Sequence, residues 1–151
     1  MRARTYIGAT IAALAMTAVG AGVANAGPPS VDPTPYLVNG TAYFSVGSVD
    51  CGIQSNGDVG CDIPAGIAKW YDVIPVTDLA IDLPFLPAHP TFGLLGPHGR
   101  PGSLGLPDSY GDSGSSITYA GATCSGGGRG GIYCTSKGHS FSFGWSGTQT
   151  T

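Results

Sequence analysis

A serine within a Gly-Asp-Ser-Gly-Ser string has the surroundings that most suggest chemistry in this sequence. Ser113 is the central residue of that string, which spans residues 111–115. A serine hydroxyl becomes a nucleophile when a histidine accepts its proton and a carboxylate orients that histidine. The sequence offers three candidate bases, His89, His98 and His139. One hypothesis is therefore a small serine hydrolase that pairs Ser113 with one of them, with His139 as the named candidate.

The same string resembles the nucleophile motif of trypsin-like serine proteases, but its context does not follow that family. No histidine stands in the alanine-rich, cysteine-flanked setting of the family's base, and the chain is short for a two-barrel protease. The string also resembles the G-D-S motif of lipase-like hydrolases, which lies near the N-terminus and precedes an Asp-x-x-His. Here it comes late, and Ser136 stands three residues before His139. Because Gly, Asp and Ser are usual turn residues, we expect a turn and no catalytic residue.

Other residue patterns argue against a metal or a cofactor. His89 and His98 lie among prolines near Arg100, without a second ligand at a spacing that would preorganise a metal site, so we expect solvated loop histidines. The Asp residues form no cluster along the chain, and no calcium-loop spacing is present. The glycine run 126–131 lacks the Lys-Ser/Thr of a phosphate-binding loop. His139 is expected to make a structural hydrogen bond.

The four cysteines predict disulfides. Cys51 and Cys61 are separated by nine residues, as are Cys124 and Cys134. Four cysteines allow three pairings, and the sequence does not by itself choose among them. The equal spacing, with a shared G-x-(V/I)-x-C pattern, favours two related hairpins that are each closed by their own disulfide. Such a spacing is not typical of zinc sites.

The N-terminal segment has the pattern of an export signal. Arg2 and Arg4 precede an uncharged, mostly apolar run, and residues 24–26 (Ala-Asn-Ala) fit the small-x-small rule for cleavage. We therefore expect residues 1–26 to be a signal peptide and the mature chain to start at Gly27. Export would place the protein outside the cytoplasm, where disulfides persist. We therefore expect a secreted protein that is extracellular or associated with the cell wall.

Charge argues against two classes of partner. Residues 27–151 hold four basic residues against nine Asp and no Glu, which gives a formal charge of −5. Nucleic acid and anionic membrane surfaces repel a chain of this sign, so neither is expected as a partner after signal cleavage. The 125 residues are one domain's length, and 35 of them are Gly or Pro, close to the level at which disorder becomes a concern.

Period-two patterns predict an all-β fold: a small sheet, a sandwich or a partial barrel. We expect strands in 37–50, a hairpin of 49–53 and 58–63 around a three-residue loop, a strand in 77–83, and strands from 116 onward that include the second hairpin. Residues 65–71 could form a helical turn, or 70–76 a strand. Phe141, Phe143 and Trp145 predict a strand with an aromatic face. The expected divisions are a signal peptide (1–26), an extended Pro-rich lead-in (27–36), one β domain (37–146) and a polar tail (147–151).

The long Pro-rich loop 84–107 is the main candidate surface. Its prolines exclude a long helix or a central strand. Its apolar residues indicate that it packs on something, so we expect it to cover one face of the sheet and to add to the core; the alternative is a partner-binding loop. The candidate binding residues are Phe92, His98 and Arg100 on this loop and Arg129 at the tip of the Gly-rich second hairpin.

Two segments together resemble a family. The first segment is residues 43–64, which contain Val49-Asp50-Cys51-Gly52-Ile53. The second is residues 117–143, which contain Gly131-Ile132-Tyr133-Cys134 followed by a Gly-His-Ser-Phe sequence. Both are similar to small secreted two-disulfide proteins of mycobacteria and related actinobacteria. The resemblance implies export, an envelope or extracellular setting and a disulfide-closed β fold. The family's function is uncharacterised, so the resemblance transfers no site residue.

The sequence therefore predicts an exported, non-catalytic protein that binds an unknown protein or envelope ligand without a cofactor. The small serine hydrolase and a structural wall component without a specific ligand are the alternatives.

Overall fold

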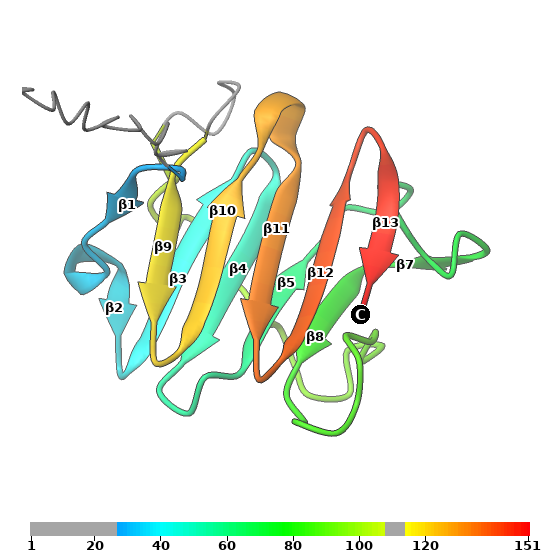
Figure 1. The fold of residues 1–151 in the computed structure, drawn as a ribbon, viewed down its shortest axis with the longest axis horizontal. Coiled ribbons are helices and arrows are strands. Elements are labelled where there is room, and N and C mark those ends of the chain that lie inside the picture. Colours follow the sequence, from blue (N-terminus) through cyan, green and yellow to red (C-terminus); the bar gives the residue numbers. More distant parts are fainter. Residues whose placement is uncertain (1–26, 108–113) are drawn as a thin grey trace, which may run out of the picture.

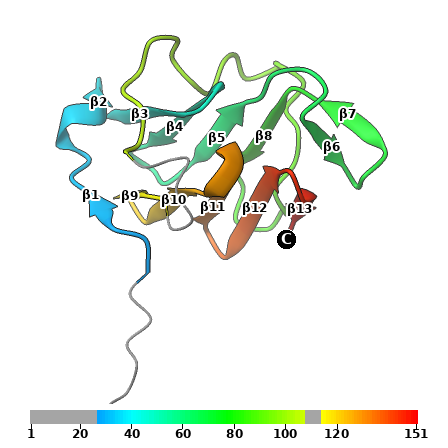
Figure 2. The same ribbon diagram turned by 90° about the horizontal axis from the view of Figure 1, so that it is seen from above.

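Alternating burial along each strand builds a two-layer sandwich. The computed structural model describes residues 27–107 and 114–151. In strand β3 (Thr41–Val46) every second side chain is buried, and the others face outward. A strand with one buried face must pack that face against another layer. Two sheets meet in this way, and their inner faces form the core (Figures 1 and 2).

The first layer is a five-stranded sheet of order β2-β3-β4-β5-β8. Its further strands are β2 (Leu37–Val38), β4 (Val49–Gln54), β5 (Val59–Asp62) and β8 (Asp78–Ile81). The β4–β5 loop is the expected three-residue loop, in which Gly57 adopts a φ of +84° and its N–H donates to Gln54 O (2.9 Å). A left-handed φ is easily adopted only by glycine, which explains this residue.

The second layer is a six-stranded sheet of order β1-β9-β10-β11-β12-β13. Its strands are β1 (Ser30–Val31), β9 (Ser116–Tyr119), β10 (Ala122–Gly126), β11 (Ile132–Ser136), β12 (His139–Gly144) and β13 (Gly147–Thr150). A separate hairpin of β6 (Ala68–Trp70) and β7 (Ile74–Val76) lies at one side (Figure 2). Within the described residues, the helical elements are two three-residue 3-10 turns, η1 (Thr34–Tyr36) and η2 (Gly128–Gly130), and no helix could span a membrane.

Each sheet carries one disulfide in a fully buried row of side chains. Cys51 bonds to Cys61 across β4 and β5, and Cys124 bonds to Cys134 across β10 and β11, which confirms the predicted pairing. In the first sheet the in-register row is Phe44, Cys51, Cys61 and Leu79. In the second it is Ile117, Cys124, Cys134 and Phe141. All eight residues are completely buried, so the two disulfides lie at the centre of the core.

The six-stranded sheet extends past both ends of the expected β domain. The expected polar tail 147–151 contains β13, which pairs with β12, because a ladder of backbone hydrogen bonds does not require apolar side chains. The expected lead-in 27–36 contains β1, which pairs in parallel with β9. The domain therefore reaches from Ser30 to the end of the chain. The predicted signal peptide, 1–26, lies outside the described residues.

Two local predictions also need correction. The segment 65–76 contains neither the helical turn nor the single strand, because Tyr71 and Asp72 adopt left-handed backbone angles that turn the chain between β6 and β7. Trp145 does not join the buried pair Phe141 and Phe143. It follows the end of β12 in a turn, where it is 85% exposed.

Candidate functional site

Residues 89–106, called the belt from here on, cross the outer face of the five-stranded sheet. The belt starts beside β8, where His89 and Ala80 exchange two backbone hydrogen bonds of 2.9 and 3.0 Å. It ends beside β3, where Ser45 N donates to Leu104 O (3.0 Å) and Leu106 N donates to Ser45 O (2.9 Å). Figure 2 shows this yellow-green segment on the side of the sheet away from the second layer. The loop therefore covers one sheet face, as expected.

The buried carboxylate of Asp78 fixes the first turn of the belt. It accepts hydrogen bonds from the backbone N–H groups of Thr91 (2.9 Å), Phe92 (3.1 Å) and Gly93 (3.4 Å), and from the Thr91 hydroxyl. Burial alone would raise the pKa of Asp78, but the Thr91 hydroxyl and the three N–H groups together lower it below its ordinary value. The turn is therefore anchored by a charged group that remains ionised at neutral pH.

A second carboxylate holds the point where the belt crosses the sheet. Asp62 accepts hydrogen bonds from His98 N (3.1 Å) and Gly99 N (2.8 Å). Asp62 is in register with Asp78 on β8 and with Asp50 on β4, so the sheet aligns three Asp residues that form no cluster along the chain. Burial, and then the charge of Asp62, raise the pKa of Asp50. The strand register, which the linear spacing does not reveal, brings these carboxylates together.

Two strand glycines make room for the belt. A Cβ atom added to Gly52 would overlap the backbone oxygen of His98, and one added to Gly60 would overlap the His98 ring. A glycine within a strand often marks such a close approach of another backbone. The Tyr43 ring lies beside Gly52, 3.3 Å from the position of that added Cβ atom. The belt can therefore lie directly on the sheet only where these side chains are missing.

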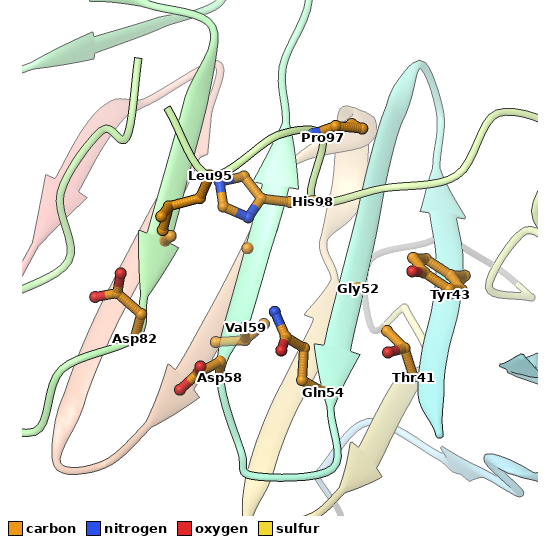
Figure 3. A pocket seen from close by; sticks show the side chains of 12 residues that line it. Thr41, Tyr43, Gly52, Gln54, Asp58, Val59, Asp82, Leu95, Pro97 and His98 are labelled. Atoms are coloured by element: carbon orange, nitrogen blue, oxygen red, sulfur yellow. The ribbon is translucent and has the colours of Figure 1, made fainter. Parts of the chain in front are cut away.

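A groove of about 260 Å³ opens on this face beside the belt (Figure 3). Its polar lining comes from Thr41, Tyr43, Gln54, Asp58, Asp82 and His98, and its apolar wall includes Leu95 and Pro97. Gln54 stands on the floor between Thr41 and Asp58, and His98 enters from the belt (Figure 3). Strands of the sheet thus supply the floor, and the belt supplies one wall.

The formal charge of the groups around the groove is negative. Lys137 forms an ion pair with Asp58 and donates to the backbone oxygen of Asp82 (2.6 Å). The Asp82 atom Oδ1 is buried without a hydrogen-bond partner, and His89 Nε2 is 3.6 Å from it. With neutral histidines, the formal charge of Asp58, Asp82 and Lys137 is −1. The groove therefore offers hydrogen-bond acceptors and a net negative field.

All three histidines have structural partners. His98 Nε2 lies 3.1 Å from Thr91 Oγ1 and 3.5 Å from Asp78 Oδ2, and its side chain is 9% exposed, so the prediction that it is solvated is wrong. His89 Nδ1 donates to Pro87 O (3.0 Å). His139 Nε2 donates to Pro84 O (3.1 Å), which is the expected structural hydrogen bond. The His139 Nε2 atom therefore carries a hydrogen in this arrangement, and the other ring nitrogen, Nδ1, is the one that could accept a proton. Ser113 lies outside the described residues.

The structure does not gather the four predicted binding residues at one site. His98 lines the groove. Arg100 lines a second hollow of about 220 Å³ on the far side of Tyr43. Phe92 is exposed on the belt. Arg129 belongs to η2 in the β10–β11 loop, and its side chain is not among the described groups.

The sequence did not identify the groove residues Tyr43, Gln54, Asp58 and Asp82. The available signal is weak: side chains alternate along β3 and β4, so the outward-facing residues of these two strands could have been assigned to one face. Among the residues that the structure describes, no group of three or more His, Cys, Asp or Glu side chains could hold a metal ion. Comparison with protein-family models, with curated proteins and with solved structures gave no match.

Proposed function

We propose that this protein is exported and acts as a non-catalytic binding protein of the cell envelope or the extracellular space, with the groove as its ligand site. The observation that carries the proposal is that the groove is preformed. The carboxylates of Asp78 and Asp62 fix the belt that forms its wall. A preformed site lowers the entropy lost on binding.

Two further observations support the setting. The two buried disulfides indicate an oxidising compartment. The cysteine segments resemble the small secreted two-disulfide proteins of mycobacteria and related actinobacteria, and we propose that the chain is related to them.

The lining indicates the chemistry of the ligand. Ligand sites for drug-sized molecules span about 300–1,000 Å³, and this groove is smaller. It therefore accepts one small polar group. Carboxylates accept hydrogen bonds, and the Oδ1 atom of Asp82 has no hydrogen-bond partner within the protein. A group that combines a hydroxyl with an ammonium ion fits this lining best.

Ethanolamine and ethylene glycol provide a matched pair of probes, since they differ only in an ammonium group and a hydroxyl. We expect ethanolamine to shift the amide NMR signals of Gly52, Gln54 and Gly60 in oxidised protein, and ethylene glycol to shift them less. Asp82→Asn should remove this preference. Asp72→Asn, a change of the same charge in the exposed β6–β7 turn, should leave it intact. Equal responses to the two probes in the wild-type protein would refute the proposal.

The two alternatives predict different results. A serine hydrolase would form an adduct with a fluorophosphonate that maps to Ser113. A structural wall component would bind neither probe and would yield no specific crosslinked partner on intact cells. The proposed binding protein should remain unmodified by the fluorophosphonate and should respond to ethanolamine.

A further inference from the structure

Most large apolar residues of the belt point away from the core. From the segment 84–107, Ala88 and Leu106 join the buried core, and the expectation that the other large apolar residues pack there is wrong. Phe92, Leu94 and Leu95 are 63%, 86% and 64% exposed. These three residues are called the apolar rim. Water-exposed apolar side chains that lie close together mark interaction surfaces.

The backbone of the rim is held in a fixed and unfavourable conformation. Phe92 has a φ of +53°, which is rare for a bulky residue, and its N–H donates to Asp78. Two successive turns follow, in which Leu94 N donates to Thr91 O (3.0 Å) and Gly96 N donates to Gly93 O (3.1 Å). Unfavourable backbone conformations that the surroundings enforce occur mainly at functional sites.

The rim is continuous with the groove. Leu95 belongs to the rim and also lines the groove, together with Pro97. Between Asp82 and Arg100 the sequence has no Asp, Glu, Lys or Arg. A negatively charged polar floor therefore adjoins an uncharged apolar surface. A ligand that matched both would have a cationic, hydrogen-bond-donating head and an apolar chain.

We infer that the ligand is an amphiphile, whose cationic head enters the groove and whose alkyl chain lies along the apolar rim. The inference rests on the proposed function of the groove and adds the part of the ligand that lies outside it. Charge complementarity selects the head, because Asp58, Asp82 and Lys137 together carry a formal charge of −1 when the histidines are neutral. The absence of charged residues along the rim segment favours an alkyl chain over a charged polymer.

A series of n-alkylamines from propylamine to octylamine, each below its micelle concentration, tests the inference by NMR titration. Removing one methylene from water contributes about 0.8 kcal/mol, which corresponds to about fourfold in affinity. Because the rim is open to solvent on one side, we expect about a two- to fourfold gain per added methylene until the rim is covered. An affinity that does not change with chain length would overturn the inference, even if ethanolamine still binds and the proposed function stands.

Matched variants assign the effect to the rim. Phe92→Ser/Leu94→Ser changes two rim residues that do not line the groove, so it should abolish the dependence on chain length and should retain the response to ethanolamine. Phe85→Ser alters another apolar side chain of the loop, 78% exposed and outside the lining of the groove, and should change neither. Chain-length dependence that persists in the double variant would place the alkyl chain elsewhere and refute the inference. If ethanolamine did not shift the amide signals of the wild-type protein, that result would instead refute the proposed function.

Discussion

Replacing Asp78 by Asn tests whether a single carboxylate holds the belt. In the wild-type protein Oδ2 accepts from Thr91 and Gly93, and Oδ1 accepts from the Phe92 N–H. An Asn side chain of the same size has one oxygen and one NH₂ group. Whichever way the amide turns, at least one backbone N–H of the turn faces another donor.

The expected magnitude follows from these contacts. A hydrogen bond to a charged group contributes about 1.5–3 kcal/mol. The left-handed backbone of Phe92 is unfavourable by about 1–3 kcal/mol and favours opening once the anchor is weakened. We expect the free energy of local belt opening to fall by about 2 kcal/mol, which corresponds to about 30-fold faster amide exchange.

Hydrogen exchange followed by NMR at the amides of Phe92 and Gly93 measures this opening directly. Asp82→Asn is the control, because it also removes one negative charge, just after the end of β8. The Asp82 Oδ1 atom, unlike the Asp78 carboxylate, has no hydrogen-bond partner. Exchange rates at Phe92 and Gly93 that are equal in Asp78→Asn and wild type would show that the carboxylate does not anchor the belt.

Acid should release the same anchor in the wild-type protein. Despite burial, hydrogen bonds from Thr91, Gly93 and Phe92 hold the pKa of Asp78 below the ordinary value of 3.8. A carboxyl whose pKa is lowered by folding stabilises the folded state fully above its unfolded value. That stabilisation is lost as the pH falls through the lower folded pKa. Belt opening, corrected for intrinsic exchange, should therefore be constant from neutral pH to about pH 5. It should begin to increase as the pH approaches the ordinary value of 3.8 and should go on increasing until the pH has fallen through the lower folded pKa.

Two further substitutions test the packing and charge below the belt. Gly60→Ala would push its methyl group into the His98 ring and should lower the free energy of unfolding in urea by about 1–3 kcal/mol. Gly105→Ala meets its nearest atom at 3.7 Å and should be neutral within about 0.5 kcal/mol; equal effects of the two changes would argue against close packing of the belt. Asp50→Asn should raise the Tm at pH 7, because burial and the charge of Asp62 raise the pKa of Asp50 and make its ionised form unfavourable. The gain should shrink as the pH falls and vanish below 3.8, where Asp50 is protonated in both states; a gain that did not depend on pH would contradict this explanation.

The cysteine hairpins were predictable because their determinants are local. The equal cysteine spacing, the alternation of side chains and the turn glycine Gly57 can all be recognised within a short stretch of sequence. The observed disulfides and the observed loop agree with them. The all-β class follows from the same alternation. The order of the strands and the choice of a sandwich depend on contacts between residues far apart in the sequence, and no local pattern specifies them.

The belt and the groove depend on such distant contacts, but comparing the two hairpins reveals a trace of them. In the first hairpin Gly52 follows Cys51 and Gly60 precedes Cys61, and the two glycines are in register. The matching positions in the second hairpin are Ser125 and Tyr133, also in register, and Tyr133 is half exposed. The hairpin with glycines at both positions is the one that the belt crosses. This difference between the hairpins could have been recognised in the sequence. The anchoring role of the carboxylates could not, because it depends on the strand register that aligns them.

The placement of the disulfides has a mechanical consequence. Each one joins neighbouring strands of a single sheet across ten positions of the chain, and neither connects the two sheets. If the protein is pulled from its ends, the layers can separate without breaking a covalent bond. Each closed loop, however, withholds about 30 Å of contour length, since an extended residue spans about 3.4 Å. An oxidised chain under tension should therefore stretch about 60 Å less than a reduced one.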